Sequence, residues 1–156
     1  MSIDADTTPM KLYAADVLFA AVMLIRHDET WTQKVMARLR SGQGTDHSDR
    51  HAVQWCAAGA VEKALHANFR YSSCPVHWTD IENVVFEALS THIPLPVAGH
   101  IRDIGEWNDD PKRTAAEVRE AMYRAAYTLL EQGGVPFSQL SMSYKKQNNL
   151  HEGKTE

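Results

Sequence analysis

The strongest constraint on how this chain can fold is an apolar stripe near its N-terminus. Six apolar residues recur at intervals of three and four positions, which is the spacing of one face of an α-helix. They are Ala14, Val17, Leu18, Ala21, Val22 and Ile25. Further apolar residues, Leu12, Phe19 and Met23, widen the stripe. A helix that is apolar on most sides needs neighbours around it, so the stripe predicts a central, buried helix.

Three later segments also space their apolar residues as a helix does, namely residues 53–65, 81–89 and 118–129. The residues Thr79 to Glu82 and Thr114 to Glu117 each form a capping-box pattern, which predicts the starts of the last two helices. The sequence therefore contains four helices with clear signals.

Two glycine positions add to this prediction. Gly59 lies inside the helical segment 53–65, where glycine costs about 1 kcal/mol relative to alanine. The usual compensation is the close approach of another backbone, which we expect at this point. The pair Gly133-Gly134 predicts the end of the last helix.

Two regions have ambiguous patterns. Residues 31–39 suit either a helix or a short strand, and residues 95–113 form a predicted loop of a length that is usually functional or partly structured. The fold prediction is all-α, an irregular or orthogonal bundle of four to five helices. One short strand or hairpin near residues 31–40 is the variant that this pattern leaves open.

Length and charge limit the function classes. A chain of 156 residues corresponds to one domain, which we place at residues 10–134 between a disordered tail (1–9) and a polar tail (135–156). The net charge of -4 argues against a general nucleic-acid binder, which usually presents a basic face. Asp4 and Asp6 stand where a secretory signal needs positive charge, and no apolar run is long enough to span a bilayer. We therefore expect a cytoplasmic protein without a membrane segment.

A cysteine nucleophile is one candidate for chemistry. Cys56 is followed by His100 and then by Asn108 and Asp109, which is the chain order of papain-like hydrolases. Such a mechanism needs a thiolate paired with an imidazole and a third group that orients the imidazole. Cys56 falls, however, on the apolar stripe of the predicted helix 53–65, which favours a buried core thiol.

A metal site has a weaker signal. Cys74 and His77 form a C-x-x-H pattern, and His47 and His51 are four residues apart. A zinc site needs four ligands, or three and a water, so these residues would serve only if their two loops met. We expect neither a metal nor another cofactor.

The segment Trp107-Asn108-Asp109-Asp110-Pro111-Lys112-Arg113-Thr114 admits three interpretations. Its acidic residues and Thr114 could cap the following helix, with Trp107 packing on the core. Asn108 and Asp109 could instead hold a polar ligand at the helix start, with Trp107 and Arg113 beside them. The pair could also orient a histidine such as His100.

Three motifs support a family resemblance. They are W-T-Q at residues 31–33, W-C-A-A-G-A at 55–60 and I-G-E-W-N-D-D-P-K-R-T-A-A-E-V at 104–118. Together they resemble a bacterial and phage family of domains of unknown function, over roughly residues 12–130. The resemblance implies these signature positions: Trp55, Cys56, Gly59, Ala60, Trp107, Asn108, Asp109, Thr114 and Glu117. Members of that family often carry glycine after W-T-Q, where this chain has Lys34.

The favoured function is a small non-enzymatic helical module that binds a protein partner or a small polar ligand. The resemblance implies an accessory role of the kind found on phages and mobile elements, and the module could form a homodimer. The alternative is a cysteine-dependent hydrolase or transferase that uses Cys56, a histidine, and Asn108 or Asp109.

Overall fold

The computed structural model describes residues 8–69, 77–94 and 101–135. Within these ranges the chain forms five α-helices, one short 3-10 helix and three short strands. In chain order they are α1 (Thr8–Leu24), η1 (Asp28–Thr30), β1 (Ala37–Leu39), β2 (Gly44–Thr45), β3 (Ala52–Trp55), α2 (Ala57–Phe69), α3 (Trp78–Ser90), α4 (Ile101–Asn108) and α5 (Ala115–Gln132). The predicted tails lie almost entirely outside the described residues, and α1 begins at Thr8.

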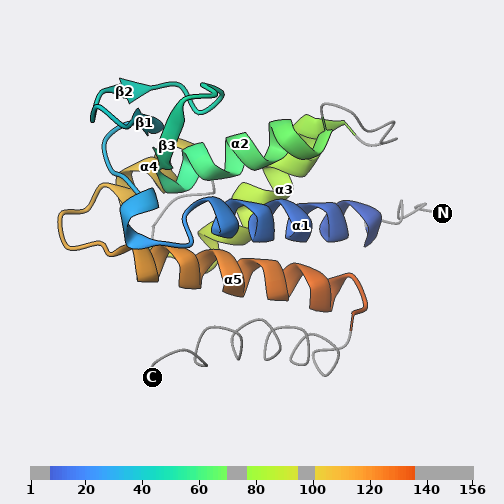
Figure 1. The fold of residues 1–156 in the computed structure, drawn as a ribbon. Coiled ribbons are helices and arrows are strands. Elements are labelled where there is room, and N and C mark those ends of the chain that lie inside the picture. Colours follow the sequence, from blue (N-terminus) through green and yellow to red (C-terminus); the bar gives the residue numbers. More distant parts are fainter. Residues whose placement is uncertain (1–7, 70–76, 95–100, 136–156) are drawn as a thin grey trace, which may run out of the picture.

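Helix α1 is the centre of the bundle, as the apolar stripe predicts. It packs against α2, α3 and α5, and α5 runs antiparallel to it along one side (Figure 1). Ala14, Leu18 and Ile25 are fully buried. Since α1 is enclosed on several sides, it holds the other helices in one core. None of the described helices is both long and apolar enough to cross a membrane.

A small antiparallel sheet corrects the all-α prediction. Its strand order is β2-β1-β3, with Ala37 paired to Thr45 on one side and to Trp55 on the other. The sheet covers the end of the bundle at which α2 begins (Figure 1). The guanidinium of Arg38 in β1 donates to Thr32 Oγ1 in the preceding loop and to the Gly42 carbonyl oxygen in the turn between β1 and β2. The fold is therefore mostly helical, with one short sheet that extends beyond residues 31–40.

The structure changes two further predictions. The helix predicted over 53–65 begins only at Ala57, because residues 52–55 pair with β1 as a strand. The predicted loop 95–113 contains helix α4.

The two capping boxes have opposite outcomes. The Thr114–Glu117 box is present, with the Thr114 hydroxyl accepting from the Glu117 backbone N–H. The box predicted from Thr79 to Glu82 is absent, because α3 starts two residues earlier than it requires and His77 occupies the cap position. At the other end of the last helix, α5 ends at Gln132 and Gly133 is its C-cap, as the glycine pair predicts.

Gly59 permits a close approach between α2 and the sheet, as expected from its position in a helix. A Cβ atom at residue 59 would overlap the carbonyl oxygen of Met36. That oxygen also accepts a hydrogen bond of 3.1 Å from the Cys56 backbone N–H, so it cannot move away freely. The first turn of α2 is thus fixed against the segment that leads into β1.

We predict that Gly59→Ala lowers the free energy of unfolding by about 3 kcal/mol, because an added methyl group overlaps main-chain atoms. Gly105 in α4 is the matched control, since a Cβ atom there would meet no heavy atom within 4 Å. Gly105→Ala should raise stability by about 0.5–1 kcal/mol, as expected for a helix interior. Urea denaturation followed by circular dichroism measures both changes. Equal stability of Gly59→Ala and the parent chain would contradict the close approach.

Candidate functional site

The motifs W-T-Q and W-N-D meet in the structure around the side chain of Asn108. Asn108 is the last residue of α4 and is fully buried. Its Oδ1 atom accepts hydrogen bonds from Trp31 Nε1 at 2.8 Å and from the Ala57 backbone N–H at 3.0 Å. Its Nδ2 atom donates to the Thr32 carbonyl oxygen at 3.1 Å and to Asp109 Oδ1 at 3.0 Å. An amide has two acceptor and two donor sites, so Asn108 has none left for a ligand.

Gln33 and Asp109 complete the junction between the two motifs. Gln33 Nε2 donates to the backbone oxygens of Asn108 and Asp110. Asp109 Oδ1 accepts from the Lys34 backbone N–H at 2.7 Å. These bonds hold the turn after W-T-Q against the end of α4.

Lys34 has the left-handed backbone conformation, with φ of 67°. Residues with a Cβ atom adopt this conformation at a cost, whereas glycine adopts it readily. In this chain, the Lys34 N–H bond to Asp109 helps to maintain the turn despite the side chain.

A pocket of about 360 Å³ opens beside this junction, between residues 34–36, the first turn of α2, and α4. We call it the α2–α4 pocket. It has a partly apolar wall, a thiol and three charged residues. Its lining residues are Lys34, Val35, Met36, Cys56, Ala58, Ile101, Arg102, Gly105 and Asp109. The volume lies within the range of small-molecule sites.

Cys56 stands at the N-terminus of α2, which corrects the prediction of a position inside a helical stripe. Its Sγ atom accepts a hydrogen bond of 3.2 Å from the Gly59 backbone N–H, so the sulfur caps the helix. Burial raises the pKa of the Cys56 thiol above its ordinary value, and the Asp109 carboxylate adds to this effect. The helix N–H groups lower the pKa but do not reverse the shift. A nucleophilic cysteine needs the opposite shift.

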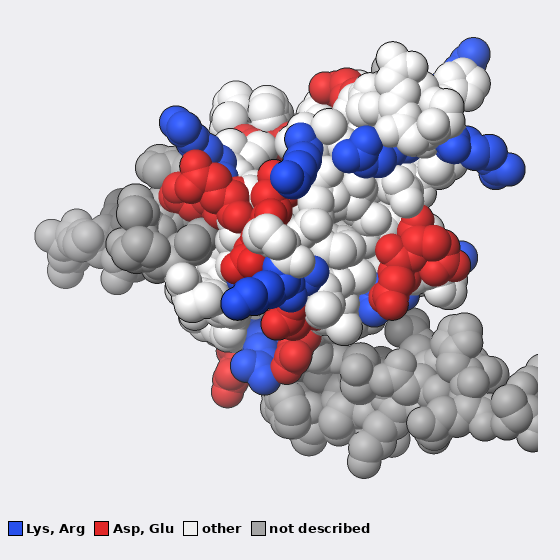
Figure 2. Space-filling view, turned by 90° about the vertical axis from the view of Figure 1, so that its left-hand side faces the viewer, with Lys and Arg blue, Asp and Glu red and all other residues white. Residues whose placement is uncertain are grey.

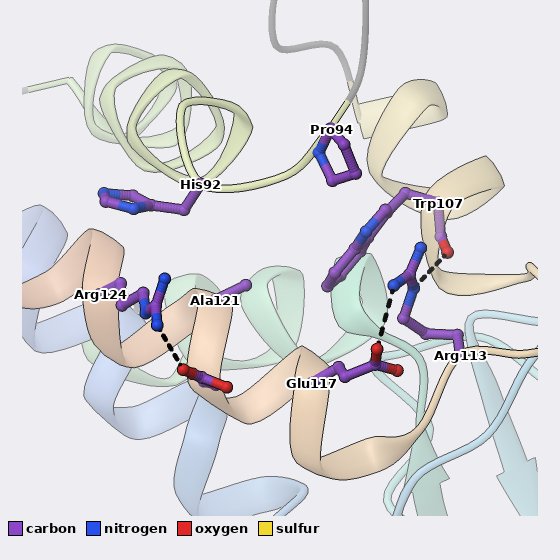
Figure 3. A pocket seen from close by; sticks show the side chains of 8 residues that line it. His92, Pro94, Trp107, Arg113, Glu117, Ala121 and Arg124 are labelled. Atoms are coloured by element: carbon purple, nitrogen blue, oxygen red, sulfur yellow. Dashed lines mark hydrogen bonds and ion pairs between the residues drawn. The ribbon is translucent and has the colours of Figure 1, made fainter.

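A second pocket, of about 170 Å³, lies between the end of α3 and the first turns of α5 (Figure 3). Figure 3 shows the Arg113 guanidinium beside the Trp107 ring, 4.5 Å from the ring centroid. Arg113 also pairs with Glu117 at 3.6 Å and donates to the Trp107 carbonyl oxygen. Arg124, on the other side of the pocket, pairs with Glu120 at 2.6 Å. The charges in this pocket therefore compensate one another, and its volume is about half that of the α2–α4 pocket.

The structure separates the four residues predicted to bind a ligand. Trp107 and Arg113 line the smaller pocket, Asp109 lines the α2–α4 pocket, and Asn108 joins structural elements. The enzymatic alternative needs Asp109 and Cys56 close together, and both residues line the α2–α4 pocket. The third member of that set, His100, lies outside the described residues.

The histidines of the weak zinc alternative do not gather in the described part of the chain. His51 and His77 are exposed, and Cys74 lies outside the described residues. His47 instead faces Glu62 and His66, two residues that sequence reasoning missed as ligands. Glu62 and His66 are four residues apart in α2, and this spacing, which the sequence shows, places both side chains on the same helix face, where they could bind one metal ion.

The surface near the junction shows charges of both signs. Figure 2 looks onto the end of the molecule that carries the sheet and the turn between α4 and α5, and acidic and basic side chains lie next to each other there. Among the ion pairs of the structure, Arg119 pairs with Asp28 at 2.9 Å. A nucleic-acid site usually needs a basic face, and this side of the molecule does not present one.

We predict that Asn108→Ala lowers the free energy of unfolding by about 3 kcal/mol or more. The substitution leaves the Trp31 indole N–H, the Ala57 N–H and the Thr32 carbonyl oxygen without their partner, and each unsatisfied buried group costs about 1–3 kcal/mol. Asp110→Ala is the control, because Asp110 is the exposed neighbour that caps the Lys112 N–H. Its effect should stay below about 1 kcal/mol in urea denaturation. A similar loss in both variants would argue against the Asn108 junction.

We predict that iodoacetamide leaves Cys56 unmodified in the folded protein near neutral pH. The side chain is only 4% exposed, and its raised pKa keeps the sulfur in the thiol form. Peptide mass mapping distinguishes Cys56 from Cys74, and protein unfolded in urea gives the reference rate. Rapid alkylation of Cys56 in the folded state would favour the enzymatic alternative.

The comparisons with known proteins assign a family. A family model described as a family of unknown function, DUF6197, matches residues 10–128. No curated protein and no solved structure matches the chain. The family match covers most of the chain, including α1, the sheet, α2 to α4, and most of α5. The chain therefore belongs to the family of unknown function DUF6197.

Proposed function

We propose that this protein is a small non-enzymatic binding module that holds a donor-bearing ligand in the α2–α4 pocket. The observation that carries the proposal is the position of Asp109. Its Oδ1 atom is fixed by two hydrogen bonds, from the Lys34 N–H and from Asn108 Nδ2. Its Oδ2 atom has no hydrogen-bond or ion-pair partner in the described part of the chain. Asp109 therefore offers a pre-positioned acceptor at the edge of the pocket.

The walls of the pocket define the rest of the ligand. Val35, Met36, Ala58 and Ile101 provide apolar surface, which favours a short hydrocarbon body. The Asp109 carboxylate favours an ammonium or hydroxyl group at one end. A free amine and a lysine side chain of a protein partner both have this chemistry.

The pocket is less suited to binding an anion at the start of α2. The N–H of Ala57 is taken by Asn108, and the N–H of Gly59 is taken by the Cys56 sulfur. A helix start binds anions through such N–H groups when they are free. The ligand is thus expected to approach Asp109 rather than the helix amides.

The enzymatic alternative rests on one observation, that Cys56 lines the same pocket as Asp109. The chemistry of the described residues gives it little support. The thiol pKa is raised, and no imidazole of the described residues lines this pocket. Binding without covalent chemistry is the function that this geometry favours.

We predict that butylamine binds in the α2–α4 pocket with a Kd on the order of 1 mM. Titration followed by ¹H–¹⁵N NMR should shift the backbone signals of Ala58, Gly105 and Asp109. Butyrate, which has a similar apolar body and a negative charge, should shift the Asp109 signal less than butylamine does, although Lys34 and Arg102 also line the pocket. Asp109→Asn should weaken amine binding roughly 10- to 100-fold, because it removes a charge-assisted hydrogen bond.

Two further variants make this experiment specific. Asp110→Asn removes an adjacent charge outside the pocket and should bind butylamine like the parent chain. Gly105→Leu fills the pocket from α4, where the added side chain has open space, and should abolish binding in a folded protein. The proposal fails if butylamine shifts none of the pocket signals, or if Asp109→Asn binds it as well as the parent chain does.

A further inference from the structure

A cluster of metal-ligating side chains lies outside the α2–α4 pocket. His47 follows β2, and Glu62 and His66 lie one turn apart on α2. One potential ligand atom from each residue lies within 4.8 Å of the other two. The His66 Nε2 atom is 4.0 Å from Glu62 Oε2, and the rings of His47 and His66 have centroids 5.0 Å apart. Segments from the sheet and from a helix thus direct three donor groups at one point.

The environment of His47 favours a ligand at its Nε2 atom. The Nδ1 atom faces Asp46 Oδ1 at 3.5 Å, whereas Nε2 is buried and has no hydrogen-bond partner in the described part of the chain. Metal-bound histidines usually have one ring nitrogen on the metal and donate from the other to a carboxylate or carbonyl group. The arrangement of Asp46 and His47 matches this pattern. The backbone of His47 is also fixed, since its carbonyl oxygen accepts from Trp55 Nε1 at 3.4 Å.

Glu62 supplies a buried carboxyl group to the same point. Its side chain is only 9% exposed, and no lysine or arginine of the described residues forms an ion pair with it. A second carboxyl group, that of Glu82 on α3, lies beside it. Two carboxyl groups in contact need a proton or a cation between or beside them. A divalent ion beside Glu62 would therefore offset the burial of its charge.

We propose that His47, Glu62 and His66 form a binding site for a zinc-type divalent cation. The donor set is two imidazole nitrogens and one carboxylate oxygen, which suits zinc and similar first-row metals. Magnesium and calcium prefer oxygen ligands throughout, so this set disfavours them. His66 is half-exposed, which leaves room for water or another small ligand at a fourth position.

The required adjustment of the side chains is small. Zinc–ligand distances of about 2.0–2.2 Å in a tetrahedral site place the ligand atoms roughly 3.4 Å apart. The three donor atoms already lie within 4.8 Å of one another, so side-chain movements of about 1 Å bring them into range. The half-exposed His66 can move most easily, because less of its ring is packed against neighbours.

This site differs from the combination of His47 with His51, Cys74 and His77 that the sequence suggested. His51 and His77 are exposed, and the potential metal ligands near His47 are Glu62 and His66 instead. The two sets share His47, so variants at the other positions distinguish them.

The test uses the full chain after a chelator has removed any bound metal. Zn²⁺ binding is then measured by calorimetric titration and by competition with a chromophoric zinc indicator. The parent chain should bind one Zn²⁺, and Co²⁺ should give the visible absorption of a four-coordinate site. His66→Gln and Glu62→Gln should weaken Zn²⁺ binding roughly 10- to 100-fold or more, since loss of even an outer partner has an effect of that size. Zn²⁺ should raise the Tm of the parent chain and not that of His66→Gln.

His51→Gln and His77→Gln are the matched controls, because each removes an exposed histidine outside the cluster. Both should bind Zn²⁺ like the parent chain, as should Cys74→Ser. His66→Gln carries the decisive comparison, because its half-exposed position allows the variant to fold, which circular dichroism verifies. The site is refuted if the parent chain binds no stoichiometric Zn²⁺, or if folded His66→Gln binds it as tightly as the parent chain.

Discussion

The end of the molecule that carries the sheet and the start of α2 depends on the hydrogen bonds of the buried Asn108 amide. The amide joins three segments that are far apart in the chain: the W-T-Q turn, the first residue of α2, and the end of α4. Each of its hydrogen bonds satisfies a group that would otherwise be buried without a partner or would need water. Such a fully satisfied network defines one arrangement of its members, because alternatives leave several polar groups unpaired.

The position of α2 follows from this junction and from Gly59. Asn108 holds the first N–H group of the helix, and Gly59 allows the helix to touch the Met36 backbone. Both candidate sites are built on the helix so placed. The α2–α4 pocket uses its first turn, and the His47–Glu62–His66 cluster uses the next turns. A small shift of α2 would change both sites. In this chain, the residues of the W-T-Q and W-N-D motifs and Gly59 therefore act together to fix this helix.

The local patterns predict much of the helical framework. The apolar stripe from Ala14 to Ile25 becomes the central helix, and the Thr114–Glu117 capping box starts α5. The close approach at Gly59 was also predictable, since glycine is costly inside a helix without such a reason. These features depend on residues near each other in the chain, and the sequence displays them directly. The strands were harder to predict because two to four residues are too few to establish an alternating pattern.

The sequence by itself determined which segments become the main helices and which residues could carry chemistry. Only the tertiary structure decided how those residues combine. Asp109 and Cys56 share a pocket, and the hydrogen-bonding groups of the Asn108 amide are all occupied. His47 meets Glu62 and His66 because the loop after β2 lies beside α2. The physical reason is that helix formation follows local spacing, whereas burial, pKa shifts and ligand geometry depend on contacts between distant segments. Those contacts are set by packing of the whole core, which no single stretch of sequence contains.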